Sequence, residues 1–353
     1  MYNYIMAFFI AIIIAYTLTP YAKKVAYKIG AIDVPKDNRR VHKVPIPRLG
    51  GLAIYIAFLT TIILMLILGK GVLTINKELI GILIGATIIV GLGIIDDAKQ
   101  ISAKYKLLGQ IIAALVVVYS GVRIEFVTNI LHKEAWIELK GLTIPATVFW
   151  IVGITNTVNL IDGLDGLAAG VSSIAALSLA FVAHINGQTE VMILLMILAG
   201  SLLGFLPHNF NPATIFMGDT GSLLVGFILA TISIEGVIKT ATTIAVAIPV
   251  LALGVPIFDT TFAIIRRFIN KKPIMEADKG HLHHRLLERG LSQKQTVLVL
   301  YLISMLLGAS AIVISDTNRK MGYLVIAIVL LGIFAGVHKI GLMKNPQEEK
   351  VNS

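Results

Sequence analysis

Carboxylate and histidine clusters interrupt a chain that is otherwise rich in apolar residues. The first cluster is the pair Asp96-Asp97, which is followed closely by Lys99, Lys104 and Lys106. Carboxylates are costly in or beside a lipid bilayer, so each one needs a reason. A helix end that water solvates and lysines neutralise is the structural explanation. Ligation of a divalent cation through oxygen is the chemical one.

The segment NTVNLIDGLDG contains the second cluster, in which Asn156, Asn159, Asp162 and Asp165 recur at intervals of three. Each step of three drifts by about 60° around an α-helix, so these four residues cannot share one helix face. The glycine after each aspartate predicts that the helix ends here and that a loop turns the carboxylates toward one centre. A polar helix cap is the structural alternative.

The third cluster combines Asn209 and Asn211 with the sequence FMGDTGS at 216–222. Asp219 and Thr220 could cap the helix that begins there. A helix N-terminus flanked by glycines also suits phosphate binding, because its amides are free and its dipole end is positive.

The fourth cluster begins with Asp259, continues with Arg266 and Arg267, and ends in the sequence HLHHR at 281–285. Three histidines in four residues are unusual as packing residues, because imidazoles are rarely buried without partners. Aspartates bind divalent cations, whereas arginine and histidine bind phosphate oxygens. The four clusters together therefore suit phosphoryl transfer, which depends mainly on positioning and charge neutralisation.

Composition defines the elements that must position these residues. The chain has 353 residues, of which 56% are apolar and 14% charged, and its mean hydropathy is +0.86. Lipid rather than water must solvate most of such a chain. Apolar runs long enough to cross a bilayer occur at 2–19, 49–69, 78–95, 107–121, 144–160, 166–184, 190–206, 219–236, 241–258, 296–315 and 321–338. We therefore expect an all-α polytopic membrane protein with eleven transmembrane helices, a single membrane domain over 1–343 and a polar cytoplasmic tail over 344–353.

The distribution of lysine and arginine predicts the orientation. Four segments, 20–48, 96–106, 259–295 and 339–353, carry 22 of the 30 basic residues. Because basic loops stay in the cytoplasm, the N-terminus is expected outside and the C-terminus inside. This topology places all four clusters at the cytoplasmic face. The separate structural explanations then fail together, and one polar site built from distant loops takes their place. Without the run at 144–160, which is short in apolar residues, only 14 basic residues would remain inside.

The remaining composition limits cofactors and partners. The chain has no cysteine, which excludes disulfides, thiolate zinc sites and iron–sulfur clusters, and oxygen ligands favour Mg2+ or Mn2+. The net charge of +10 fits basic loops against anionic lipid and not nucleic acid. The outside segment 122–143 has short alternating patterns that predict a small hairpin.

Five ordered motifs resemble the polyprenyl-phosphate N-acetylhexosamine-1-phosphate transferase family, which includes the MraY, WecA and TagO enzymes. The motifs are RRVHKVPIPRLGG at 39–51, DDAKQISAKYKLLGQ at 96–110, NTVNLIDGLDGLAAG at 156–170, NFNPATIFMGDTGS at 209–222 and HLHHRLLERG at 281–290. The sequence HKVPIPR at 42–48, the arginine of HLHHR and the expected eleven helices are similar to the WecA and TagO branch.

The resemblance implies transfer of N-acetylglucosamine 1-phosphate from UDP-GlcNAc to undecaprenyl phosphate in the bacterial cytoplasmic membrane. The product would start a cell-wall or surface polymer such as teichoic acid, and dimers are common among relatives. Magnesium would be held by Asp219, with Asp97 associated. The implied catalytic residues are Asp96, Asp97, Asp162, Asp165, His283 and His284. The implied substrate-binding residues are Lys43, Arg48, Lys106, Asn156, Asn159, Asn211, His281 and Arg285.

Several alternatives remain open. Within the family, the donor could be the muramoyl-pentapeptide nucleotide of the MraY branch. CDP-alcohol phosphotransferases also have an acidic membrane site, but their Asp-Gly continues with Ala-Arg, whereas here Asp162-Gly163 continues with Leu-Asp-Gly. An ion-coupled transporter would carry its acids near the middle of helices and show inverted repeats. We expect direct attack by the lipid phosphate, with an aspartyl-phosphate on Asp97 as the two-step alternative.

Overall fold

The computed structural model describes residues 3–34, 44–69, 71–128, 136–238, 246–271 and 280–340. Within these residues, ten helices are long and apolar enough to cross a membrane. The corresponding elements are α1 (Asn3–Ile29), α2 (Gly50–Leu68), α3 (Lys77–Lys99), α4 (Ala103–Ser120), α5 (Thr143–Ile161), α6 (Leu167–Ile185), α7 (Thr189–Asn209), α8 (Gly218–Ser233), α12 (Gln293–Asp316) and α13 (Arg319–Ile340). The chain is an all-α polytopic membrane protein, as the composition predicted.

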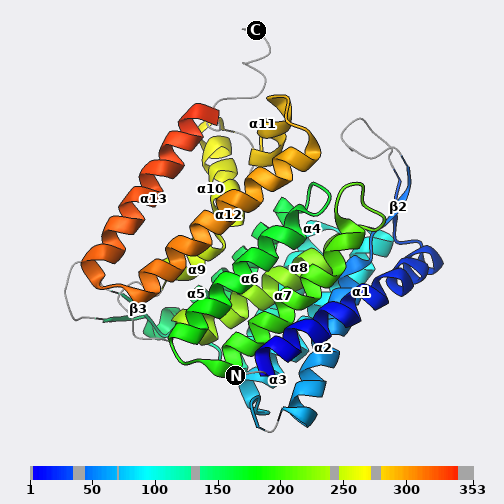
Figure 1. Cartoon of the computed structure of the whole chain (residues 1–353), viewed down its shortest axis with the longest axis horizontal. Helices are drawn as coiled ribbons and strands as arrows, with labels where there is room; N and C mark the ends of the chain where they lie inside the picture. Colours follow the sequence, from blue (N-terminus) through cyan, green and yellow to red (C-terminus); the bar gives the residue numbers. More distant parts are fainter. Residues whose placement is uncertain are drawn as a thin grey trace.

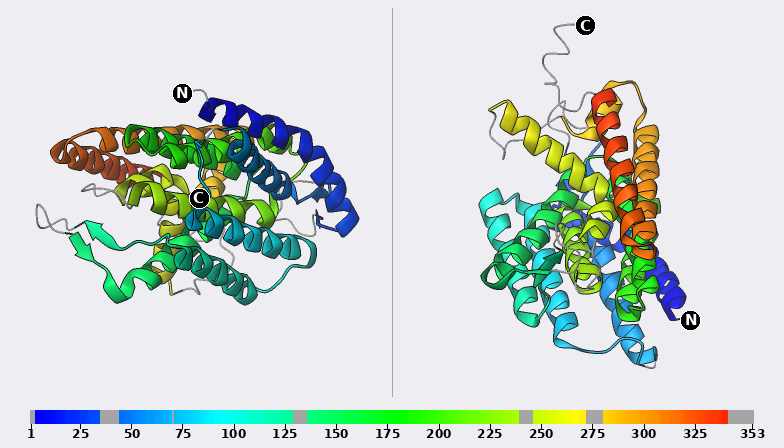
Figure 2. Two further views of the ribbon diagram at one scale, coloured as in Figure 1. Left: turned by 90° about the horizontal axis from the view of Figure 1, so that it is seen from below. Right: turned by 90° about the vertical axis from the view of Figure 1, so that its left-hand side faces the viewer.

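The predicted ninth crossing, 241–258, is not one continuous helix in the described part of the chain. It contains α9 (Ala247–Ala252) and continues as α10 (Gly254–Ile269), which runs eleven residues beyond the predicted end. Pro256 explains the break, because a proline inside a helix clashes with the carbonyl four residues earlier, here that of Ala252. Figure 2 shows α10 in yellow, leaving the bundle at an angle. Residues 239–245 lie outside the described residues, so an eleventh crossing stays a prediction.

Two short antiparallel ribbons connect helices at opposite ends of the bundle. Between α1 and α2, strand β1 (Ile32–Asp33) pairs with β2 (Ile46–Pro47). Between α4 and α5, strand β3 (Phe126–Thr128) pairs with β4 (Trp136–Glu138), which confirms the predicted hairpin. In Figure 1, α11 (Leu282–Glu288) and β2 lie toward one end of the helices and β3 toward the other.

Glycines let α2, α3 and α8 meet backbone to backbone at the end that carries the acidic clusters. A Cβ added to Gly51 would lie 2.0 Å from the amide nitrogen of Gly221, and one added to Gly93 would lie 2.4 Å from Cα of Thr220. The amide of Gly51 also donates to the carbonyl of Met217 at 2.9 Å. Because no side chain separates these helices, the C-terminus of α3 is held against the N-terminus of α8.

Candidate active site

Asp97 caps the N-terminus of α8. Its Oδ1 accepts from the amide of Asp219 at 3.0 Å, and its Oδ2 accepts from the amide of Thr220 at 2.9 Å and from its hydroxyl at 2.6 Å. The Asp97 side chain is fully withdrawn from solvent. The helix is therefore capped by a carboxylate 122 positions earlier in the chain, and not by Asp219 or Thr220. These two amides donate to the Asp97 carboxylate.

Arg48 caps the C-terminus of α3, on the other side of the contact between α3 and α8. Its Nη2 donates to the carbonyls of Asp96 at 3.3 Å and Asp97 at 3.0 Å, and its Nε donates to the carbonyl of Asp97 at 3.2 Å. A cation is favourable here, because the carbonyls that end a helix lack helical partners and carry partial negative charge.

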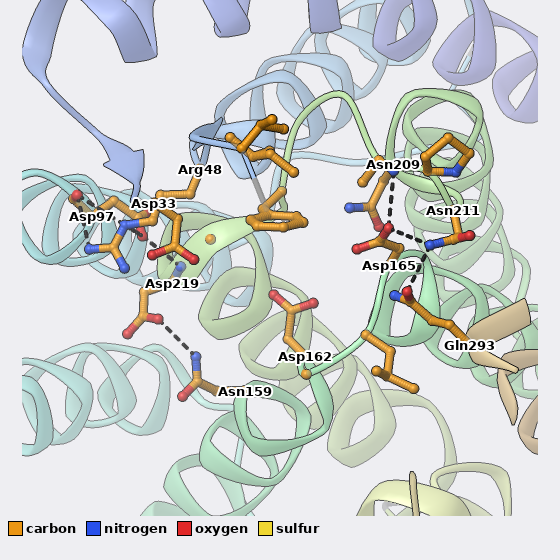
Figure 3. A pocket seen from close by; sticks show the side chains of 18 of the residues that line it. Asp33, Arg48, Asp97, Asn159, Asp162, Asp165, Asn209, Asn211, Asp219 and Gln293 are labelled. Atoms are coloured by element: carbon orange, nitrogen blue, oxygen red, sulfur yellow. Dashed lines mark hydrogen bonds and ion pairs between the residues drawn. The ribbon is translucent and has the colours of Figure 1, made fainter. Parts of the chain in front are cut away.

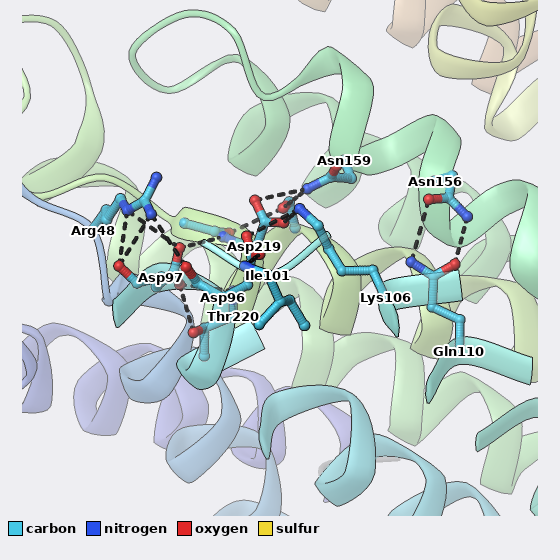
Figure 4. A network of polar contacts seen from close by, with 12 residues as sticks. Arg48, Asp96, Asp97, Ile101, Lys106, Gln110, Asn156, Asn159, Asp219 and Thr220 are labelled. Carbon is cyan, nitrogen blue, oxygen red and sulfur yellow. Dashed lines mark hydrogen bonds and ion pairs between the residues drawn. The ribbon is translucent and has the colours of Figure 1, made fainter. Parts of the chain in front are cut away.

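Lys106 lies between two carboxylates that come from different helices. Its Nζ is 3.0 Å from Oδ2 of Asp96 and 2.8 Å from Oδ2 of Asp219 (Figure 4). The remaining oxygen of each carboxylate is used elsewhere, since Asp96 Oδ1 accepts from the amide of Ile101 and Asp219 Oδ1 accepts from Asn159. Each aspartate thus offers one oxygen to the same cation.

Asn156 is paired with Gln110 one helical turn beyond Lys106. The two side-chain amides exchange hydrogen bonds of 2.6 and 3.2 Å between α4 and α5, and Gln110 is almost fully buried. Asn156 was predicted to bind substrate. Its amide joins the helices that carry Lys106 and Asn159, and substrate binding by Asn156 stays a prediction.

The loop between α5 and α6 turns inward as the glycines predicted. Gly166 has a φ of +78°, in the left-handed region that favours glycine. Asp165 Oδ2 accepts from the side chain of Asn211 at 2.9 Å and from the amide of Ala213 at 3.0 Å. Asn211 also donates to Gln293 at 2.7 Å (Figure 3). The Asn211 side-chain amide therefore connects Asp165 of this loop to Gln293 at the start of α12.

Two buried contacts fix the end of this loop. Asn209 Oδ1 accepts from the amide of Gly166 at 3.1 Å, and the Tyr301 hydroxyl donates to the carbonyl of Gly166 at 2.5 Å. A Cβ at Gly170 would lie 1.9 Å from the ring of Tyr301, so only glycine lets the ring approach.

Asp162 lies at the end of α5, beside a cavity of about 540 Å3. Figure 3 shows it between Asp219 and Asp165. Withdrawal from water, together with the charges of Asp219, Asp97 and Asp165, raises the pKa of Asp162 to about 8. A carboxyl group whose pKa is raised by its neighbours is a frequent mark of a functional site.

The histidines lie on α11, above the same loop. His281 Nδ1 is 2.9 Å from Oδ2 of Asp259, and the rings of His281 and His283 stack at 5.8 Å. His283 is 2% exposed, and a Cβ at Gly163 would lie 2.7 Å from its Nε2. Burial and the charge of His284 lower the pKa of His283 to about 3, so this ring is neutral at pH 7.

The cavity collects most, but not all, of the predicted residues. The predicted residues that line it are Arg48, Asp97, Asn159, Asp162, Asp165, Asn211, Asp219 and His284. Asp96 and Lys106 join it through Asp219, and His283 joins it through Gly163. Asn156, His281 and Arg285 do not line it. Lys43 lies outside the described residues, as do residues 344–353.

Asp96 and Asp219 each point one oxygen at a single cation, the ammonium of Lys106. In the described residues, no group of three or more histidine or acidic side chains could hold a metal. Magnesium often uses only one or two protein carboxylates and completes its shell with water and substrate phosphates. A pair of carboxylates that already aims one oxygen each at a cation fits that pattern.

Sequence reasoning missed Gln110, Gln293 and Tyr301. Gln293 opens α12 directly after a serine cap, and Tyr301 lies inside an apolar run. Their positions in the sequence give no signal of a polar role, because each acts on a partner more than 40 residues away.

Comparison with known proteins identifies the class to which this site belongs. The model of glycosyl transferase family 4 matches residues 79–237, from the first turn of α3 to beyond the end of α8. A Bacillus subtilis (strain 168) protein named a probable undecaprenyl-phosphate N-acetylglucosaminyl 1-phosphate transferase is 44% identical over 331 residues, 94% of this chain and 90% of its own. The chain belongs to glycosyl transferase family 4.

Two further relatives represent different branches. The decaprenyl-phosphate N-acetylglucosaminephosphotransferase of Mycobacterium leprae (strain TN) is 35% identical, covering 92% of this chain and 87% of its own. A phospho-N-acetylmuramoyl-pentapeptide-transferase of Staphylococcus saprophyticus is 33% identical, covering 86% of this chain and 95% of its own.

Proposed function

We propose that this protein transfers N-acetylglucosamine 1-phosphate from UDP-GlcNAc to undecaprenyl phosphate, giving undecaprenyl diphosphate-GlcNAc and UMP. The observation that carries the proposal is the convergence of Asp96, Asp162 and Asp219 with Lys106 beside one cavity. The 44% identical relative bears the same activity in its name. The reaction is a first membrane step of cell-wall or surface polymer synthesis, teichoic acid included.

The nucleophile is an oxygen of the lipid phosphate, and the electrophile is the β-phosphorus of the nucleotide sugar. A new phosphorus–oxygen bond forms while the bond from the β-phosphorus to the oxygen shared with the α-phosphate breaks, and UMP leaves with that electron pair. Two anions must approach, and at 4 Å they repel by about 4 kcal/mol at an effective dielectric of 20. Lys106 and the predicted magnesium supply the opposing charge.

Asp219 is the proposed magnesium ligand, with Mn2+ as an alternative ion and Asp96 beside it. When bound, the ion neutralises charge on the diphosphate. Asp97 supports Asp219 through its backbone amide, and direct ligation by Asp97 stays a prediction.

Direct displacement agrees with the bonding of Asp97. A phosphate monoester has its second pKa near about 6, so the lipid phosphate is already mostly dianionic at pH 7 and needs no strong base. Both oxygens of Asp97 accept hydrogen bonds from α8, which reduces their nucleophilicity. A phosphorylated aspartate in a rapid quench with UDP-GlcNAc alone would refute direct displacement.

The proposed orientation has the N-terminus outside, the C-terminus inside and the active site at the cytoplasmic face of the bacterial cytoplasmic membrane. The segments 20–48, 96–106 and 259–295, which include the ends of the helices beside them, hold 19 of the 30 basic residues. The chain has no cysteine, so single cysteines at Glu288 and Ile137 can report sidedness by labelling. Only the Ile137 position should react with an impermeant maleimide in intact cells. A homodimer stays a prediction from the resemblance.

The first experiment measures UMP release by the purified protein with undecaprenyl phosphate and Mg2+. We expect release with UDP-GlcNAc, abolished by EDTA, and none with UDP-MurNAc-pentapeptide. Release with the pentapeptide nucleotide alone would favour the activity of the 33% identical relative. No release with either nucleotide by folded protein would return the ion-coupled transporter to consideration.

A further inference from the structure

Asp259 is a buried carboxylate whose two oxygens both contact the residues that begin α11. Its Oδ2 is 2.9 Å from Nδ1 of His281, and its Oδ1 accepts from the amide of Leu282 at 2.7 Å. The residue is 5% exposed. A carboxylate is rarely buried to this extent unless its bonds have a purpose.

A second contact from the same face of α10 reinforces the first. Arg266 lies seven residues after Asp259, two helical turns along one stripe, and its Nη1 donates to the carbonyl of Gly280 at 2.9 Å. A Cβ at Gly280 would lie 2.2 Å from Nη2 of Arg266, so glycine is what lets the guanidinium reach the backbone. α10 therefore holds three consecutive residues, 280 to 282, at two points.

Away from this stripe, α10 exposes large apolar side chains, of which Phe268 and Ile269 are the most exposed. A helix with a buried polar stripe and an exposed apolar face is amphipathic in the reverse sense of a soluble surface helix. Its polar stripe is therefore not explained by solvation, and the contacts to residues 280 to 282 account for it.

Three imidazole rings in contact connect the bonds between α10 and α11 to the cavity. His281 stacks on His283 with the ring planes 7° apart, and the centroids of His283 and His284 are 4.2 Å apart. His283 packs on Gly163, next to Asp162, and His284 lines the cavity. A shift of His281 would consequently move the two rings that face the acidic loop.

We propose that Asp259 is a positioning residue that fixes α11 on α10 and thereby places His283 and His284 over the acidic loop during sugar-phosphate transfer. The proposal rests on the proposed function for its catalytic consequence. The bonds that define the position do not depend on that function.

The test compares Asp259→Ala and Asp259→Asn with Thr261→Ala. Thr261 is an exposed residue of α10 whose hydroxyl donates only within the helix, to Ile257, among the contacts described. We expect Asp259→Ala to lower kcat about 100-fold with a KM for undecaprenyl phosphate within about twofold of the wild type, because small displacements of catalytic groups cost this much. Asp259→Asn keeps an acceptor for the amide of Leu282 and should lose about tenfold. Thr261→Ala should keep full activity.

A mutant cycle separates positioning from general destabilisation. In a His283→Ala/His284→Ala background, Asp259→Ala should cause little further loss, because residues that act through the same groups are not additive. Multiplying losses in the combined variant would overturn the proposal, as would unchanged kcat in Asp259→Ala.

Spin labels give a readout that needs no activity. Labels on cysteines placed at Glu288 of α11 and Lys104 of α4, both exposed, should give one narrow distance in the parent and a broad distribution with Asp259→Ala. An unchanged distribution would overturn the proposal even if the wild type released no UMP. Absence of UMP release by the parent would by itself refute only the proposed function. If Asp259→Ala fails to fold, Asp259→Asn carries both measurements.

Discussion

Replacing Asp97 by asparagine tests whether this carboxylate is a helix cap or a nucleophile. Asparagine keeps one acceptor oxygen but turns an NH2 group toward the amide of Asp219 or toward Thr220, both of which are donors to Asp97 in the wild type. At least one charge-assisted hydrogen bond is lost, which costs about 1.5–3 kcal/mol. The first turn of α8, which carries Asp219, should shift.

The expected result is a lower Tm together with a loss of about 100-fold in kcat, the effect that a displacement of about 1 Å can have on a catalytic group. Thr220→Val is the graded control, because it removes the 2.6 Å hydroxyl bond and leaves both amide bonds. It should cost about 1 kcal/mol of stability and less than about tenfold in kcat.

The assays are UMP release, thermal unfolding in detergent and Mn2+ affinity by electron paramagnetic resonance. If Asp97 is a helix cap, Asp97→Asn lowers turnover, Tm and Mn2+ affinity together. If Asp97 is only a nucleophile, the substitution lowers turnover alone. Unchanged Tm and Mn2+ affinity with no detectable turnover would refute the cap.

Four further outcomes follow from the geometry. Because the folded-state pKa of His283, about 3, lies below the unfolded value near 6.5, its contribution to stability is complete above pH 6.5 and is lost toward pH 3. The loss should reach about 2 kcal/mol by pH 5, so His283→Gln should flatten the dependence of Tm on pH, and parallel Tm profiles would count against this. Gly163→Ala should displace His283 and lower kcat with little change in Tm, as paired kinetics and melting would show. Gly93→Ala meets the backbone of Thr220 and should lower Tm by several degrees, so an unchanged melting curve would contradict the packing. Lys106→Met should bind Mn2+ more tightly than wild type while losing turnover, and weaker Mn2+ binding would show that the ammonium and the metal do not compete for Asp96 and Asp219.

The apolar runs predicted most helices because length and hydropathy alone define a membrane-crossing segment. At the ninth predicted crossing they did not reveal the break between α9 and α10, where Pro256 interrupts the helix although its neighbours are apolar. They also ended the first helix at 19, whereas α1 continues to Ile29, since Lys23 and Lys24 are compatible with a helix that leaves the lipid.

The gathering of Asp96, Asp162 and Asp219 followed from sidedness and could be predicted. The hydrogen-bond partners of these side chains could not be predicted from the sequence. Asp97 binds amides 122 positions away, Asn156 pairs with Gln110, and Tyr301 reaches a carbonyl 135 positions earlier. Such pairs depend on how helices stack, which periodicity within one helix does not encode.

The joint at Gly51, Gly93 and Gly221 limits how this enzyme can be re-engineered. Glycine is already the smallest residue at these positions, where the helix backbones touch. Any substitution in a mutational library adds a side chain that must push the helices apart. Variation in donor choice must therefore come from the parts of the cavity wall that have side chains to exchange, such as Gln293 and His284. A library built on those positions can change what the cavity accepts while the corner that holds Asp96, Asp97 and Asp219 keeps its shape.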